Sequence, residues 1–119
     1  MSNISIDMTD FQKLSRLQDE LDETLQNADR AGIELSQAER EYKIALNKKA
    51  LELRAEKSPM PVTLINQVIY GYKDIADKRF KRDIAESKFN VLKERINFLK
   101  LRIRILDNQI SREWYHNGG

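Results

Sequence analysis

With 119 residues, the chain is long enough for one domain with a core of modest size. Charged residues make up 34% of it and it holds only four Gly and two Pro, a composition typical of a helix-rich protein. No apolar run reaches the ~18 residues of a membrane span, and the first ten residues lack a signal-peptide pattern, so we expect no membrane contact and a cytoplasmic location. The lack of Cys excludes disulfides and thiolate chemistry.

Charge is unevenly distributed along the chain, although the formal net charge is only +2. Residues 1–41 contain ten acids and four bases, whereas residues 42–119 contain nine acids and seventeen bases. Such asymmetry indicates either a basic arm that binds nucleic acid or two halves that neutralise each other.

A long first helix is predicted over residues 9–57. Thr9 and Gln12 have the spacing of a capping box, in which the two side chains satisfy free backbone N–H groups at a helix start. Apolar and small residues then repeat every seven positions, the pattern of a helix packed along one side. The two columns of this seam are Leu14, Leu21, Ala28, Leu35 and Tyr42, and Leu17, Thr24, Ala31, Ala38 and Ala45. Gly32 borders the seam, and we expect it to accommodate a bulky neighbour rather than to act as a hinge.

A turn and a short helix are predicted over residues 58–71. Pro59 and Pro61 end the first helix, because Pro lacks an N–H and restricts the residue before it. The most apolar short run of the chain follows at residues 62–72. There we expect about two helical turns, with Thr63 as N-cap and Gly71 in a left-handed conformation at the end. A continuous helix through Gly71 is the alternative.

The second long helix is predicted over residues 72–115, and its apolar residues occupy three columns. Two of them merge into one stripe: Ala85, Leu92, Leu99 and Leu106, with Phe89, Ile96, Ile103 and Ile110. The third column lies roughly 100 to 160° away and consists of Ile84, Val91, Phe98 and Ile105, with which we group Trp114. Folding back at the prolines makes the helices antiparallel and brings Ala28 near Leu92 and Tyr42 near Lys78. The predicted fold is therefore all-α, one coiled-coil-like helical hairpin spanning residues 1–119.

The third column exceeds what a two-helix hairpin can cover. One companion helix hides the merged stripe, so the sequence predicts that Ile84, Val91, Phe98, Ile105 and Trp114 form a homo-oligomer interface, in a dimer or a larger helical bundle. The alternative is that the short helix folds back over part of this face.

Neither catalysis nor a bound cofactor or metal is expected. The single His116 lies near the end of the chain and there is no Cys, which makes a transition-metal site improbable. Four clustered acids, Asp19, Glu20, Asp22 and Glu23, point in several directions on a helix and indicate a solvated face. No Gly-rich phosphate loop or nucleophile motif is present.

Two further surfaces are candidates for binding. One is a basic stripe on the second helix that could follow nucleic-acid phosphates, formed by Arg79, Arg82, Lys93, Lys100 and Arg104. The alternative for this stripe is a solvated flank that pairs with Asp22 and Asp29. The other is an apolar tip with a basic collar, formed by Val62, Leu64, Ile65, Ile69, Tyr70 and Tyr72. Packing of the same residues onto the long helices is the alternative for the tip.

The second half of the chain carries a family resemblance. The residues concerned are Pro61 to Ile65, Gly71, Arg79 and Phe80, Arg82 and Asp83, Ala85 and Glu86, Ile96 and Asn97, Leu99 and Lys100, Ile103, Ile105 and Leu106, Gln109 and Ile110, and Arg112 to Trp114. Over roughly residues 57–114 this pattern resembles small uncharacterised early-gene proteins of tailed phages and prophages of Gram-positive bacteria. The resemblance implies an accessory role in phage DNA metabolism or host takeover in the host cytoplasm, and it assigns no functional residue.

Three functions are consistent with these patterns. The first is a non-enzymatic, self-associating accessory or adaptor protein that contacts an unknown protein partner. The second is a nucleic-acid-binding accessory protein of phage recombination or replication that uses the basic stripe. The third is an inhibitor of a host defence or replication enzyme, which no sequence feature separates from the first.

Overall fold

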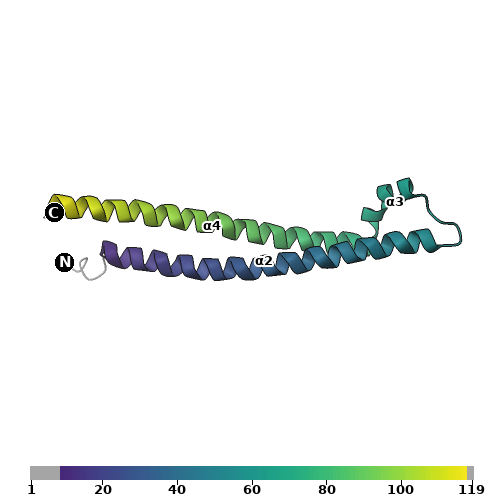
Figure 1. The fold of residues 1–119 in the computed structure, drawn as a ribbon, viewed down its shortest axis with the longest axis horizontal. Coiled ribbons are helices and arrows are strands. Elements are labelled where there is room, and N and C mark those ends of the chain that lie inside the picture. Colours follow the sequence, from purple (N-terminus) through teal and green to yellow (C-terminus); the bar gives the residue numbers. More distant parts are fainter. Residues whose placement is uncertain (1–8, 118–119) are drawn as a thin grey trace. The chain divides into compact units, whose positions relative to one another are not determined.

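The chain is an antiparallel helical hairpin, as the heptad columns predict. The structure is a computed structural model that describes residues 9–117, and in that range it is all-α. Two long helices, α2 (Asp10–Ala55) and α4 (Lys73–Asn117), run in opposite directions, with α3 (Val62–Val68) and the 3-10 helix η1 (Ile69–Gly71) in the connection between them (Figure 1). The bounds of both long helices fall within two residues of the predicted ones.

The capping box at the start of α2 is confirmed. The backbone N–H of Thr9 donates to Gln12 Oε1 at 2.9 Å, and the backbone N–H of Gln12 donates to Thr9 Oγ1 at 3.2 Å. These reciprocal bonds satisfy two donors that a helix start otherwise leaves free. Local chemistry therefore determines where α2 begins.

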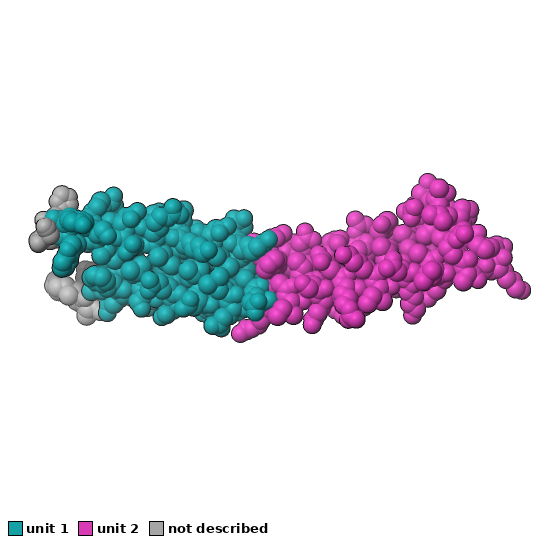
Figure 2. Space-filling model, in the orientation of Figure 1, with its two compact units in different colours: residues 1–29, 91–119 teal, residues 30–90 magenta. Residues whose placement is uncertain are grey.

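The chain divides into two compact units, which Figure 2 colours differently. Unit 1 comprises residues 1–29 and 91–119, and unit 2 comprises residues 30–90. In unit 1 the buried side chains Thr24, Ala28 and Leu99 line the contact between α2 and α4, and Thr24 Oγ1 donates to the carbonyl of Glu20 at 2.7 Å. The small residues of α2 thus leave room for the larger ones of α4.

Unit 2 contains the largest apolar cluster. Tyr42 and Leu53 of α2 pack there with Ile65 of α3, Ile69 of η1 and Ile75 of α4, which is fully buried. Elsewhere in the unit, a Cβ added to Gly32 would lie 3.3 Å from Phe89 Cε1. The prediction that Gly32 accommodates a bulky neighbour is therefore confirmed.

The turn after α2 is closed by hydrogen bonds. The backbone N–H of Met60 donates to the carbonyl of Leu53 at 3.2 Å, and Arg54 Nη1 donates to the carbonyl of Met60 at 3.0 Å. Pro61 caps α3 in an extended conformation and gives no side-chain hydrogen bond. The first bond satisfies a carbonyl that the end of α2 leaves without a helical partner, and the second ties the Arg54 side chain of α2 to the turn.

Two details predicted for the short helix are wrong. Thr63 is the second residue of α3 rather than its N-cap, because Pro61 precedes the first turn. Gly71 ends η1 without a left-handed φ, and the chain leaves the 3-10 turn through Tyr72 at φ −69° and ψ 135°. A 3-10 turn followed by one extended residue makes this bend, so no positive φ is needed.

Candidate functional site

The heptad seam of the hairpin is covered. Every predicted seam residue of α2, and every residue of the merged stripe of α4, is buried or half-buried. Cross-helix pairs follow the predicted antiparallel register, because Arg82 stacks over the Tyr42 ring at 5.1 Å and Lys78 approaches Glu41. The seam is therefore used mainly within the chain.

The third column of α4 is open. Its side chains, Ile84, Val91, Phe98 and Ile105, are between 48% and 67% exposed, and we call them the open column. Partial exposure of four aliphatic or aromatic side chains at heptad spacing is the pattern of a helix face that lacks a neighbour.

The structure adds two residues to this face and removes one. Phe80 precedes Ile84 by four positions, and Leu101 lies between Phe98 and Ile105; both are exposed. Their i+3 and i+4 spacing was the signal that could have identified them. Trp114 lies nine positions after Ile105, roughly half a turn away around the helix.

Trp114 instead lines a hollow near the start of α2. Its partners in this hollow are Asp10, Phe11, Ile110 and Glu113. Ile110 belongs to the covered stripe, so Trp114 borders the seam side of α4. The prediction that Trp114 continues the open column is wrong, because its position does not follow the heptad spacing.

The tip residues divide into two groups. Ile65 and Ile69 are each 4% exposed and belong to the apolar cluster, so their assignment to a contact surface is wrong for this chain. Tyr72 is half-buried under Lys49, whose Nζ lies 5.0 Å from the ring centroid. The exposed members of the predicted tip surface are Val62, Leu64 and Tyr70. The tip is therefore mainly a packing element with a small apolar rim.

The basic stripe is also divided. Arg79 stacks on the Tyr70 ring at 5.1 Å, and Arg82 Nε donates to Asp83 Oδ1 at 2.7 Å while its guanidinium covers Tyr42. Lys93 is also engaged. Within residues 9–117, Lys100 and Arg104 make no hydrogen bond or ion pair through their side chains. Only these two remain fully available to an anionic ligand.

Acids of α2 pair with bases of α4, which confirms that part of the charge asymmetry cancels internally. Lys81 Nζ lies 3.0 Å and Lys78 Nζ 3.8 Å from Glu41 Oε2. The hydrogen bond from Lys81, aided by the positive charges of Lys81 and Lys78, lowers the pKa of Glu41. Similar pairs join Glu34 to Lys88 and Glu20 to Arg95. All are solvent-exposed, so each contributes little stability.

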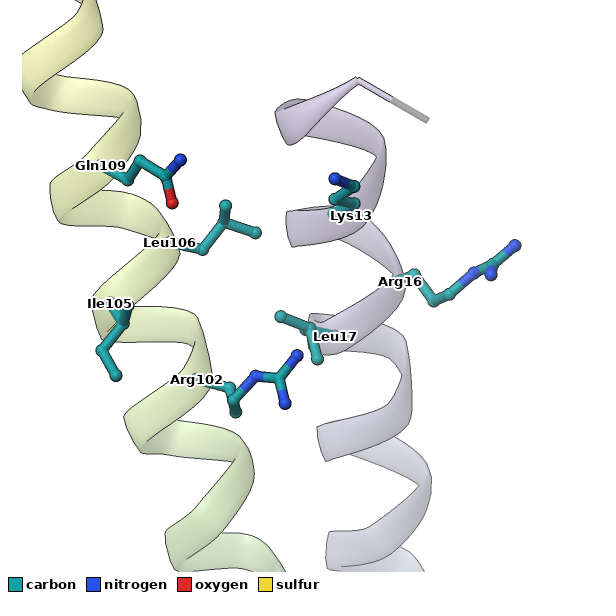
Figure 3. Close-up of a pocket in the computed structure, with 7 residues that line it drawn as sticks. All are labelled: Lys13, Arg16, Leu17, Arg102, Ile105, Leu106 and Gln109. Atoms are coloured by element: carbon teal, nitrogen blue, oxygen red, sulfur yellow. The ribbon is translucent and has the colours of Figure 1, made fainter. Parts of the chain in front are cut away.

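Two grooves between α2 and α4 border the open column. The basic groove, in unit 1, has a volume of about 390 Å³ and is lined by Lys13, Arg16, Leu17, Arg102, Ile105, Leu106 and Gln109. In Figure 3, Leu17 and Leu106 point toward each other, Arg102 reaches across toward α2, and Arg16 points away from α4. Within residues 9–117 no ion pair involves its three cations.

The second groove, in unit 2, has mixed charge. This mixed groove has a volume of about 380 Å³, and it is lined by Glu34, Gln37, Ala38, Glu41, Lys81, Ile84, Ala85 and Lys88. Its two carboxylates already pair with its two lysines. The open column therefore has a cationic groove beside Ile105 and, beside Ile84, a groove whose acids and lysines pair with each other.

Comparison with known proteins gives no relative. No family model, curated protein or solved structure matches the chain. No helix within residues 9–117 combines the length and apolarity needed to cross a membrane. In the same range, no three His, Asp or Glu side chains gather as a metal site would require.

Proposed function

We propose that this chain is a non-enzymatic accessory protein that self-associates through the open column and acts through protein–protein contacts. The observation that carries the proposal is the exposure of Ile84, Val91, Phe98 and Ile105 on a helix whose other apolar stripe is covered. Phe80 and Leu101 enlarge the same face. Burying the four column residues would contribute ~1.5 to 3 kcal/mol each before the cost of association is subtracted.

Light scattering and sedimentation on the purified chain test self-association. We expect a dimer or larger species at micromolar concentration, and we expect Phe98→Asp to give a monomer with unchanged helicity. Leu51→Asp is the matched control, because Leu51 is an exposed apolar residue of α2 outside the column. A wild-type monomer whose mass Phe98→Asp leaves unchanged would falsify the proposal.

The setting in which this assembly acts is proposed from the family resemblance. An accessory role in phage DNA metabolism or host takeover, in the host cytoplasm, is compatible with a helical adaptor. Capture of partners from infected cells with the wild type and with Phe98→Asp tests this role. Partners lost together with self-association would support an assembled adaptor, and phage or host replication proteins among them would support the setting.

Nucleic-acid binding is the second candidate, and the unpaired Lys100 and Arg104 favour it. The case for nucleic-acid binding is weaker at Arg79 and Arg82, because Arg79 stacks on Tyr70 and Arg82 already contacts Tyr42 and Asp83. Binding to single- and double-stranded DNA should then fall by orders of magnitude between about 50 and 200 mM salt. It should also fall on Lys100→Glu but not on Lys48→Glu, which makes the same charge change on α2. No binding at the lower salt concentration removes this candidate.

A further inference from the structure

One edge of the contact between α2 and α4 carries ion pairs in which the acid belongs to α2 and the base to α4. These pairs are Glu20 with Arg95 in unit 1, and Glu34 with Lys88 and Glu41 with Lys81 in unit 2. The acids share one heptad position of α2, and the bases share one heptad position of α4. The edge therefore has a regular charge pattern in each unit.

The basic groove of unit 1 lies where this pattern changes sign. Seven residues before Glu20, the same position of α2 is occupied by Lys13, and seven residues after Arg95, the same position of α4 is occupied by Arg102. Both side chains line the groove, and Arg102 reaches across toward α2 (Figure 3). Two cations therefore lie where the neighbouring heptad has an acid and a base.

The positive charge of the groove is not compensated by an acid of the groove itself. Among the lining side chains of residues 9–117 there is no carboxylate, and Arg16 adds a third cation at the outer edge. Glu20, the next acid on this edge, already pairs with Arg95. Arg102 contacts the Phe98 ring instead, with its Cζ 5.6 Å from the ring centroid. The groove is therefore complementary to a negatively charged ligand.

The floor of the groove is apolar. Leu17 and Leu106 point toward each other and are only half-buried, whereas Thr24 and Leu99, one heptad away on the two helices, are buried. Ile105 borders this floor and is 53% exposed. Covering these side chains favours a ligand that carries apolar groups beside its negative charge.

The extent of the apolar surface favours a protein segment over a small molecule. Ile105 makes the floor continuous with Phe98 of the open column, within the same unit. The surface thus extends over two turns of α4, and the cations of the groove lie beside it. A helix with apolar anchors at i, i+3 or i+4 and i+7 fits a surface of this kind, whereas a small molecule would fill the groove and leave Phe98 uncovered.

We infer that the basic groove binds an acidic amphipathic helix of a partner protein. An apolar side chain of that helix covers Leu17 and Leu106, and one of its carboxylates lies between Lys13 and Arg102. This carboxylate takes the part that Glu20 plays for Arg95 one heptad away. The assignment rests on the proposed role in protein–protein contacts and adds the chemistry of the partner; it does not require self-association.

Fluorescence anisotropy with two labelled peptides tests this chemistry. Both peptides are helices of about 18 residues with Leu at i, i+4 and i+7, and they carry either Glu or Gln at the positions that flank the Leu residues. The Glu peptide should bind the full chain about tenfold more tightly than the Gln peptide at about 50 mM salt, and this preference should shrink at about 200 mM salt because salt screens exposed charges.

Lys13→Glu is the sharpest variant, because it supplies the carboxylate from the chain itself. A Glu at position 13 has the same sequence offset from Arg102 that Glu20 has from Arg95. It should weaken binding of the Glu peptide by about tenfold without lowering the urea midpoint, and Arg102→Gln should weaken it by about threefold. Lys48→Glu, the same charge change on α2 outside the groove, should leave binding unchanged.

The outcomes separate this assignment from the proposed function. Val91→Asp removes a column residue that does not line the groove, so it should give a monomer that still binds the Glu peptide. Equal binding of the two peptides, or unchanged binding by Lys13→Glu, overturns the assignment while self-association stands. A wild-type monomer that prefers the Glu peptide supports the assignment and overturns self-association.

Two other occupants of the groove would also be recognised. Octanoate, a small anion with an apolar tail, is titrated against the wild type and Lys13→Glu. Binding of octanoate that Lys13→Glu abolishes, without binding of the Glu peptide, overturns the helix and assigns the groove to a small molecule. Weaker self-association of Arg102→Gln, again without peptide binding, overturns it in favour of a second copy of the chain.

Discussion

The contact between Gly32 and Phe89 predicts a substitution whose effect depends on its neighbour. Replacing a mid-helix Gly by Ala normally stabilises a helix by about 1 kcal/mol. In α2, however, the new methyl group would lie 3.3 Å from Phe89 Cε1 and 3.6 Å from Cζ. The first distance is tighter than ordinary van der Waals contact, so the ring must move by a few tenths of an ångström or the helices must separate.

The two effects are expected to cancel in the wild-type background. Overpacking costs typically 1 to 3 kcal/mol, and a single aromatic edge that can shift belongs at the lower end of this range. Gly32→Ala should therefore change the free energy of unfolding by less than about 0.5 kcal/mol. With Phe89→Leu, the ring carbons Cε1 and Cζ are absent, and the full gain of about 1 kcal/mol should appear. The coupling energy between the two sites is then about 1 kcal/mol.

Urea unfolding of the four variants, followed by circular dichroism at one protein concentration, measures this coupling. Gly71→Ala is the matched control, since an added Cβ there meets no atom within 4 Å and the residue lacks a left-handed φ. Gly71→Ala should raise the free energy of unfolding by about 0.4 to 1 kcal/mol, both with Phe89 and with Phe89→Leu. If Gly32→Ala stabilises by about 1 kcal/mol both with and without the Phe89 ring, the idea that Gly32 is needed for this close approach is refuted.

Three further predictions concern the cluster, the ion pairs and the cap. Ile75→Ala should lower the free energy of unfolding by about 2 to 5 kcal/mol in denaturant titrations, because Ile75 is fully buried. Val62→Ala should change it by less than about 0.5 kcal/mol, because Val62 is exposed. Equal effects would contradict this difference in burial. Because the pKa of Glu41 is lowered in the fold, its contribution is present above its ordinary pKa of 4.5 and is lost as pH falls through the folded pKa. The difference in urea midpoint between wild type and Glu41→Gln should therefore be largest near pH 7 and should shrink below pH 4.5. A difference that grows as the pH falls would contradict a stabilising role for the ionised Glu41 carboxylate. Thr9→Ala should lower the stability of the first turn of α2 by about 1 kcal/mol, because it removes the side-chain acceptor of the capping box. Amide hydrogen exchange in that turn should become faster. Unchanged exchange would show that the capping box does not stabilise the helix start.

The hairpin could be predicted because its signals are local and periodic. Thr9 and Gln12 act within one turn, and seven-residue spacing needs only one long helix to be visible. Pro59 and Pro61 then determine where the chain turns, and the turn determines which parts of α2 and α4 face each other. Each step uses neighbouring residues, so no distant contact had to be known.

The tip could not be predicted in the same detail because distant residues decide its packing. Residues 62–72 are apolar almost throughout, so the run itself does not indicate which side chains turn inward. Ile65 and Ile69 are the buried pair because they pack against Tyr42 and Leu53 of α2 and Ile75 of α4. The expectation of a left-handed Gly71 failed for a related reason, since a 3-10 turn closes the bend.

The basic groove shows what a helix-by-helix interpretation of charge omits. The stripe from Arg79 to Arg104 was identified because its residues share one helix face, yet two of its arginines are engaged by rings and a carboxylate. Arg102 lies almost ninety residues after Lys13 and Arg16 in sequence, and the three form a group only once the antiparallel register is applied. The signal was available in that register, because residues 13–17 contain no acid and face a segment of α4 in which Asp107 is the only one. Binding surfaces of a hairpin combine two helices, so unpaired charge has to be counted across the seam rather than along one helix.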